Sequence, residues 1–340
     1  MLVAGKNYRT VWMENNNVRM IDQRLLPFKF ELFSSKNHKE TAKAIKDMVV
    51  RGAPAIGAAA GYAMAQGFIE KNEKNARKII ESARPTARNL FYATDRVFNA
   101  AINSKNKTAA AISEAQKIAD EDVENCKKIG SYGEKLIKNN SRVMTHCNAG
   151  WLACVDWGTA LSPLYVAKRK GKEFTVYASE TRPRAQGAKL TAWELQNEGI
   201  DHVIIPDSAS AHLMSERKVD LIIVGADRIA ANGDVANKIG TLEKAIAAKE
   251  FSVPFYVAAP TTTIDMKTKT GKEIPIEHRD EEEVLYTYGY DGKDIKKLLI
   301  ANESKAMNPA FDVTPAKFIK GIITEKGIVK TDKIKQIMKL

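Results

Sequence analysis

The hydrophobic pattern divides the chain into two parts with different periodicity. Up to about residue 130, apolar residues recur at helical spacing, which predicts helices over residues 40–50, 55–69, 89–102 and 109–137. Before them, strand-like residues flank Asn15-Asn16-Asn17 within residues 8–23. Asn tolerates the positive φ of a tight turn, so this segment is typical of a β-hairpin. We therefore expect a helical N-terminal domain preceded by a hairpin.

From about Ser141 onwards, short apolar or β-branched runs alternate with helical stretches such as AKLTAWELQNEG. The runs are SRVMTHC, EFTVYAS, HVIIPDS, VDLIIVGAD and PFYVAAP. Alternation of this kind predicts a parallel sheet with right-handed crossovers. We expect an α/β fold with a doubly wound, mostly parallel, Rossmann-like C-terminal domain. The predicted domains are residues 1–130 and 131–340, joined within or beside a long helix.

In such a sheet, ligands bind beyond the carboxyl ends of the strands. We therefore expect one crevice to gather the residues at the predicted strand ends, which are Cys147, Glu180, Asp207, Asp227 and Pro260.

Composition narrows the class of protein. Hydrophobic residues make up 44% of the 340, charged residues 28%, and the formal net charge is +12. The lysines are spread along the chain without a basic run or an aromatic-basic motif, which disfavours nucleic-acid binding. An anionic small substrate explains positive charge equally well. No apolar run approaches the roughly 20 residues of a membrane span, and the start has no signal-peptide core, so we expect a cytoplasmic protein.

The three cysteines differ in their predicted settings. Their odd number and the lack of a C-x-x-C pair argue against both a disulfide framework and a zinc site. Cys126 and Cys154 are expected within helices as small buried hydrophobes. Cys147 is expected at a strand end, followed by Asn148-Ala149-Gly150 and a helix, where backbone N–H groups would attract anions and favour the thiolate. A structural role is the alternative for Cys147.

Three further stretches contain candidate polar groups. Arg51 and Gly52 precede Pro54 at a predicted helix start, where they would form a phosphate cradle or only a turn with a solvated arginine. Asp227 ends a strand buried on both faces, and burial would raise its pKa as a general acid requires; a helix cap is the alternative. Gln186 stands at one predicted helix start, and Asn237 with Lys238 at another.

Seven motifs, in this order, resemble the methylthioribose-1-phosphate isomerases of methionine salvage, from about Trp12 to Ile328. They are RGAPAIG, RPTARNL, THCNAG, ETRPRAQGAKLTAWEL, GADRIAANGDVANKIGT, PIEHRDEEEV and NPAFDVTPAKFIKGIITEKG. The resemblance implies that Cys147 and Asp227 are catalytic. It implies a substrate-binding set of Arg51, Gly52, Ala53, Arg84, Asn148, Gln186, Asn237 and Lys238.

The resemblance also implies a homodimer, no metal and no organic cofactor. The reaction would convert the aldose 5-methylthioribose 1-phosphate to the ketose 5-methylthioribulose 1-phosphate, by proton or by hydride transfer. Three alternatives remain open: an isomerase of 5-deoxyribose 1-phosphate, one of ribose 1,5-bisphosphate, or a non-catalytic regulatory subunit like those of the related translation exchange factor. Positions that look atypical of the family are Arg88, Trp151, Asp156, Trp157 and Leu242.

Overall fold

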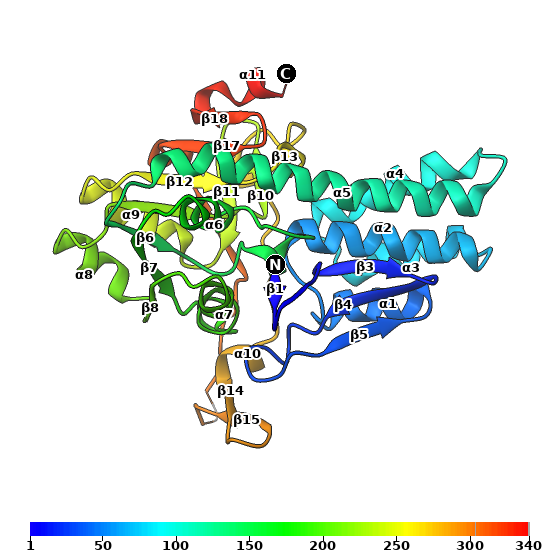
Figure 1. Ribbon diagram of the computed structural model, residues 1–340, viewed down its shortest axis with the longest axis horizontal. Coiled ribbons are helices and arrows are strands. Elements are labelled where there is room, and N and C mark those ends of the chain that lie inside the picture. The colour runs from blue at the N-terminus through cyan, green and yellow to red at the C-terminus, as the bar shows by residue number, and fades with distance from the viewer. Residues whose placement is uncertain (303, 339–340) are drawn as a thin grey trace.

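A computed structural model describes residues 1–302 and 304–338 of the chain. Helices gather at one end and a large sheet lies at the other (Figure 1). The expected N-terminal helices are confirmed, and a further short one, α3, joins them. Their bounds are α1 His38–Lys46, α2 Ala53–Ile69, α3 Glu73–Ala83, α4 Arg88–Ile102 and α5 Lys107–Gly133.

The predicted hairpin is confirmed as β3 (Val11–Glu14) and β4 (Asn17–Ile21), which pair in antiparallel fashion. Asn15 and Asn16 form its turn with φ values of 50° and 66°, the left-handed conformation that Asn tolerates. A third strand, β5 (Leu32–Ser35), extends this sheet beyond the predicted hairpin. A separate short pair precedes it, β1 (Leu2–Val3) with β2 (Lys6–Asn7).

Helix α2 is the centre of the helical part. Almost all of its side chains are buried, because it packs against α1, α3, α4 and α5. Its small residues make this contact close: a Cβ added at Gly57 would lie 3.1 Å from the carbonyl oxygen of Asn89. The first turn of α2 is thereby held firmly, facing the sheet.

The expected parallel sheet is confirmed and has the strand order β18-β17-β12-β9-β6-β7-β8. Its strands are parallel except for β18 at one edge. Their bounds are β6 Ser141–Thr145, β7 Phe174–Ser179, β8 His202–Ile205, β9 Leu221–Val224, β12 Phe255–Ala258, β17 Gly321–Thr324 and β18 Gly327–Val329.

Two apolar cores, one on each face, make the sheet doubly wound. One core joins the sheet to α6 (Ser162–Arg169), α7 (Ala192–Asn197) and the C-terminal part of α5. The other joins it to α8 (Ala209–Ser215), α9 (Thr241–Glu250) and α11 (Ile334–Ile337). Burial on both faces explains why these strands are apolar throughout.

A second sheet, which we did not predict, lies beside the carboxyl ends of the parallel strands. It has the order β13-β10-β11-β16, with β13 Ile264–Asp265, β10 Arg228–Ala230, β11 Val235–Lys238 and β16 Phe311–Thr314. Asn237 and Lys238 therefore end a strand, and the prediction that they start a helix was wrong. Helix α9 begins only at Thr241. The reason is a hairpin that turns at Asn232-Gly233 and pairs Arg228 with Ala236.

The predicted domain join near residue 130 falls in α5. Ala115 and Ile118, in the N-terminal part of α5, belong to the core of the helical part. Ile129, nearer its C-terminus, belongs to a core of the sheet. The division into two domains stays a prediction. The remaining elements are α10 (Glu282–Leu285) and the projecting hairpin β14 (Tyr286–Tyr290) with β15 (Ile295–Leu299) (Figure 1). Across the described residues, no helix is long and apolar enough to cross a membrane.

Candidate active site

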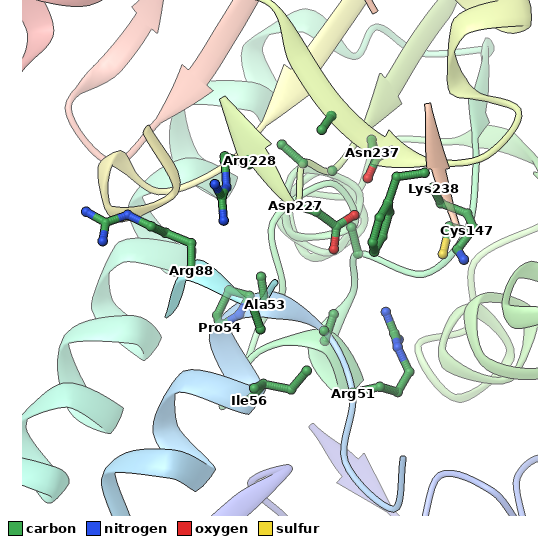
Figure 2. A pocket seen from close by; sticks show the side chains of 18 of the residues that line it. Arg51, Ala53, Pro54, Ile56, Arg88, Cys147, Asp227, Arg228, Asn237 and Lys238 are labelled. Atoms are coloured by element: carbon green, nitrogen blue, oxygen red, sulfur yellow. The ribbon is translucent and has the colours of Figure 1, made fainter. Parts of the chain in front are cut away.

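One pocket lies between the first turn of α2, the carboxyl ends of β6 and β9, and the second sheet (Figure 2). Of the five predicted strand-end residues, Cys147, Asp227 and Pro260 line it, whereas Glu180 and Asp207 do not. All ten candidate site residues line this pocket: Arg51, Gly52, Ala53, Arg84, Cys147, Asn148, Gln186, Asp227, Asn237 and Lys238.

The wall from the helical part begins with Arg51 and the start of α2. Gly52 adopts φ 94°, and a Cβ there would lie 2.5 Å from Cα of Ala153, so a larger residue would push the helix away from the sheet. Pro54 follows in the first turn, as predicted. Helix starts attract anions, and Arg51 adds a guanidinium beside this one.

Three residues that line the pocket, Arg84, Arg88 and Gln186, each have a buried polar atom without a hydrogen bond to any described part of the chain. Arg84 donates from Nη2 to Glu277 at 2.9 Å. Its Nε, like the Oε1 of Gln186, is buried and makes no hydrogen bond to any described part of the chain. Buried polar atoms are normally paired, so these three indicate where a polar ligand would bind.

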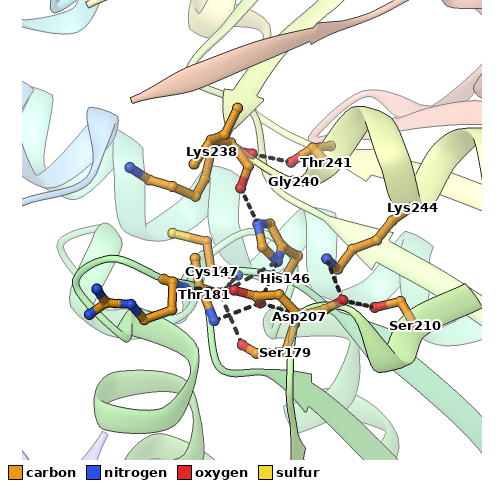
Figure 3. A network of polar contacts seen from close by, with 12 residues as sticks. His146, Cys147, Ser179, Thr181, Asp207, Ser210, Lys238, Gly240, Thr241 and Lys244 are labelled. Carbon is orange, nitrogen blue, oxygen red and sulfur yellow. Dashed lines mark hydrogen bonds and ion pairs between the residues drawn. The ribbon is translucent and has the colours of Figure 1, made fainter. Parts of the chain in front are cut away.

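Cys147 follows β6 in the left-handed conformation, with φ 61°. Its N–H donates to Thr181 Oγ1 at 2.8 Å, and its carbonyl accepts from Thr191 Oγ1 at 2.7 Å. Thr181 is held in turn by Asp207, which accepts from its N–H at 2.8 Å (Figure 3). Residues after β7 and β8 thus fix the unusual backbone of Cys147.

The chain after Cys147 differs from the prediction. Instead of a helix, a single 3₁₀ turn follows at Trp151–Ala153, and α6 begins only at Ser162. Cys154 therefore lies outside a helix, contrary to expectation, whereas Cys126 lies within α5 as predicted. Both are buried free thiols.

The expectation that Cys147 favours the thiolate was wrong. Burial raises the pKa of the Cys147 thiol above its ordinary value of 9.0. The positive charges of Arg51 and Lys238 and the N–H of Asn148 lower that pKa, but by less than burial raises it. Burial also raises the pKa of Cys126 far above 9 and that of Cys154 to about 11.

Asp227 lies at the centre of the pocket, with its carboxyl facing the Cys147 and Lys238 side (Figure 2). Its N–H donates to the carbonyl of Ala236 at 2.9 Å, so the hairpin of the second sheet fixes its position. Burial raises the pKa of the Asp227 carboxyl above 3.8, against the opposing charges of Lys238 and Arg51. The predicted direction of this shift is confirmed.

Lys238 and Asn237 end β11. Burial lowers the pKa of Lys238, and its Nζ lies 5.3 Å from the ring centroid of Phe311. The Asn237 side chain donates from Nδ2 to Thr241 Oγ1 at 3.0 Å, which ties it to the start of α9. Lys238 is therefore an almost completely buried amine on the sheet side of the pocket. Asn237 supports the start of α9.

His146 was missed by sequence reasoning. It is 1% exposed, and its Nε2 lies 2.7 Å from the carbonyl of Ile239 (Figure 3). Burial lowers its pKa to about 3, so the ring is neutral and Nε2 donates this bond. His146 thereby joins the loop of Cys147 to the strand of Lys238. The only sequence signal was a polar residue at the end of an apolar strand.

Arginines at the other end of the pocket were also missed as lining residues. Arg88 and Arg228 lie there on the far side of Asp227 (Figure 2). They lie 3.9 Å and 3.7 Å from the carboxylate of Asp265. Arg228 also donates to the carbonyl of Thr86 at 3.0 Å. Its position directly after Asp227 was the available signal.

Cys154, which lines the pocket, brings its side-chain ligand atom and those of Asp122 and Cys126 within 4.8 Å of one another. The Asp122 carboxylate already accepts from the N–H of Val155 at 2.7 Å, and burial raises its pKa to about 7. Burial raises the pKa of both thiols, which therefore keep their protons at neutral pH, and this disfavours a metal because metals bind the deprotonated forms. This group shares no residue with the candidate catalytic pair.

Comparison with known proteins agrees with this geometry. The model of the initiation factor 2 subunit family matches residues 49–331. The methylthioribose-1-phosphate isomerase of Desulfatibacillum aliphaticivorans is 46% identical, over 97% of this chain and 96% of that protein. The enzyme of the same name from Acetivibrio thermocellus is 48% identical, over 93% of this chain and 94% of that protein.

Two solved structures are similar over 98% of the chain. One is 5-methylthioribose 1-phosphate isomerase from Pyrococcus horikoshii OT3, with a TM-score of 0.88, 43% identity and 96% of that chain covered. The other is described as translation initiation factor eIF-2B, subunit delta, from A. fulgidus, with a TM-score of 0.85, 40% identity and 100% of that chain covered. By these similarities, the chain belongs to the initiation factor 2 subunit family and, within it, to the methylthioribose-1-phosphate isomerases.

Proposed function

We propose that this chain isomerises 5-methylthioribose 1-phosphate to 5-methylthioribulose 1-phosphate in methionine salvage, with Cys147 and Asp227 as the catalytic pair. The observation that carries the proposal is that both side chains face one pocket whose lining includes Arg51, Arg84 and Lys238. A thiol and a carboxyl supply the proton-transfer groups, and the cations suit a sugar phosphate.

The phosphate on the anomeric oxygen sets the first requirement. It blocks the usual opening of an aldose through a free anomeric hydroxyl, so the bond between C1 and the ring oxygen must break instead. Asp227 donates its proton to that ring oxygen as the bond breaks. The raised pKa of its carboxyl keeps the proton available at higher pH than for an ordinary aspartate.

Hydrogen then moves from C2 to C1. In the proton route, the Cys147 thiolate removes the C2 proton to form an enol phosphate and returns that proton to C1. In the hydride route, hydrogen passes directly from C2 to C1, and Cys147 only shapes the pocket. In both routes the Asp227 carboxylate takes the O2 proton as the ketone forms, which restores the acid. The raised thiol pKa means that the proton route needs Arg51 and Lys238 to stabilise the thiolate.

The start of α2 and the cations around it bind the phosphate. The backbone N–H groups of Gly52 and Ala53 stand where a helix N-terminus favours an anion. Arg51, Arg84 and Lys238 approach from three different elements. Gln186, through its unfilled Oε1, accepts a hydrogen bond from a sugar hydroxyl.

The rival is a non-catalytic regulatory subunit on the same fold, which the likeness to the A. fulgidus protein keeps as the second candidate. Turnover decides between them: the purified chain should convert methylthioribose 1-phosphate to the ketose 1-phosphate, followed by NMR. Absence of product would support the regulatory subunit. Competition by kcat/KM against 5-deoxyribose 1-phosphate and ribose 1,5-bisphosphate then identifies the preferred 5-substituent.

We further propose a cytoplasmic homodimer that needs neither a metal nor an organic cofactor. Cys126 and Cys154 are neighbours yet both are free thiols, which fits a reducing compartment. Exposed apolar side chains at the edge strand β8 and on α9 (Val203, Ile204 and Ile246) fit a subunit interface. Light scattering at several concentrations tests the dimer, and activity after chelation tests the metal.

A further inference from the structure

Glu194 in α7 is a fully buried carboxylate, with 0% exposure and no salt bridge to residues 1–302 or 304–338. Four donors surround it: the N–H of Trp151 at 2.7 Å, the N–H of Leu152 at 3.2 Å, Nδ2 of Asn148 at 2.8 Å, and the hydroxyl of Tyr165. Two donors reach each oxygen. Burying a carboxylate costs free energy. A set of donors this complete therefore indicates a position that requires a carboxylate.

One of these contacts leads directly into the pocket. Asn148 uses its Nδ2 on Glu194 and its Oδ1 to accept from Nη1 of Arg51 at 2.5 Å. The carbonyl of Asn148 accepts from Nη2 of Arg51 at 2.6 Å. Asn148 thus holds the Arg51 guanidinium through two hydrogen bonds, and Glu194 fixes the orientation of the Asn148 side-chain amide. Because its side chain is occupied in this way, Asn148 acts on a ligand through Arg51.

The other contacts fix the loop that follows Cys147. The N–H groups of Trp151 and Leu152 belong to the 3₁₀ turn after Gly150, and that turn packs under the start of α2 at Gly52. The fit is close, since a Cβ at Gly150 would lie 2.1 Å from Oε2 of Glu194. One side chain therefore sets the loop of the catalytic cysteine and the phosphate-binding arginine together.

We infer that Glu194 is a positioning residue for phosphate binding: through Asn148 it holds the Arg51 guanidinium in the orientation that receives the phosphate of the substrate. This inference rests on the proposed function, because the phosphate is that of the proposed substrate. Glu194 is fully buried and does not line the pocket, so it acts on a ligand through the groups that it holds, and its effect on phosphate binding passes through Asn148 and Arg51.

The test uses Glu194→Gln, which keeps the size but replaces one acceptor oxygen with an NH₂ group. In either orientation of the amide, its NH₂ group faces at least one N–H donor, that of Trp151 or those of Asn148 and Leu152. We expect KM for methylthioribose 1-phosphate to rise about tenfold, with a smaller change in kcat. The matched control is Glu198→Gln, one turn further along, where the carboxylate pairs with Arg169 at 3.1 Å away from the pocket. Its KM should stay at the wild-type value.

A double-mutant cycle with Arg51→Ala shows whether the effect passes through Arg51. If it does, adding Glu194→Gln to Arg51→Ala should change KM less than twofold, because the residue that Glu194 positions is already gone. An equal tenfold rise in both backgrounds would overturn the inference, as would a wild-type KM in Glu194→Gln alone.

A second variant covers the case in which Glu194→Gln does not fold, as judged by circular dichroism. Asn148→Ala cuts the same connection in the middle and should show the same rise in KM and the same dependence on Arg51. If wild type has no turnover, the proposed function fails, and the inference is tested separately with inorganic phosphate. Phosphate should then protect Cys147 from alkylation at about tenfold lower concentration in wild type than in the variant; equal protection would overturn the inference.

Discussion

The two walls of the pocket differ in kind. The wall from the sheets presents Cys147, Asp227 and Lys238, whose pKa values are all displaced by burial towards the neutral form. The wall from the helical part presents arginines at helix ends, held by polar partners such as Asn148 and Glu277. The difference teaches that strand ends supply groups able to exchange protons, whereas the helical wall supplies fixed positive charge. Changes in the first should therefore act on kcat, and changes in the second on KM.

The largest expected effect is that of Asp227→Asn. The amide has nearly the same shape but no proton to donate, so kcat should fall about 10²- to 10⁴-fold while KM changes little. Steady-state kinetics measures both, and a melting temperature near that of wild type would show that the fold is kept. A nearly unchanged kcat would remove Asp227 from the mechanism and break the distinction between the walls.

Next in size is Arg51→Ala on the opposite wall. Loss of a charge-assisted contact should raise KM about 10- to 100-fold and leave kcat closer to wild type. Lys238→Ala is the informative partner, because Lys238 belongs to the sheet wall and its charge acts on Asp227 more strongly than that of Arg51 does, whereas Arg51 acts more strongly on Cys147. That variant should lose kcat as well as affinity. Identical changes in both variants would mean that the two walls share one role.

The pH dependence of alkylation sharpens the comparison within the sheet wall. The pKa of Cys147 is raised, so the neutral thiol dominates at neutral pH and the thiolate fraction grows about tenfold per pH unit until that pKa is reached. Iodoacetamide labelling of Cys147, followed by mass spectrometry, should rise with pH without levelling off below pH 9, and substrate should slow it. Cys126 and Cys154 are fully buried and should react later. A plateau near pH 7 would show an activated thiolate instead.

The smallest expected effect concerns Arg88. Arg88 and Arg228 place two positive charges beside the single carboxylate of Asp265, so an anionic group at this end of the pocket would gain more from them than a neutral one. Arg88→Val should lower kcat/KM for ribose 1,5-bisphosphate about 2- to 5-fold relative to methylthioribose 1-phosphate, the size expected of a partly exposed charge. Lys78→Val, an exposed substitution in α3, is the control and should leave the ratio unchanged.

Much of the fold could be predicted because local patterns determine it. Apolar runs predicted β6, β7, β8, β9 and β12 but not the parallel strand β17, and Gly52 with Pro54 marked the start of α2. The hairpin that carries Asn237 and Lys238 also had a signal, Asn232-Gly233, which is typical of tight turns. We missed it because the small polar residues beside Asp227 suggested a loop that leads into a helix.

The sequence could predict which residues form the site, but not the protonation states of their side chains. The ten residues came from motifs that resemble the methylthioribose-1-phosphate isomerases, and they do line one pocket. The direction of the Cys147 pKa depends on the balance between burial and the charges of Arg51 and Lys238, which only the three-dimensional arrangement sets. Glu194 lies within the ETRPRAQGAKLTAWEL motif, but its burial could not be predicted, since a glutamate in a helical segment is usually exposed.

Helix α5 also determines how the molecule loses its structure. Its 27 residues span about 40 Å, and its apolar side chains belong to the cores of both parts. Unfolding of the helical part would remove Ile129 from the core of the sheet. Unfolding of the sheet would remove the packing around the C-terminal part of α5. Heat should therefore abolish both walls of the pocket in one cooperative transition, with no surviving half that keeps a formed binding surface.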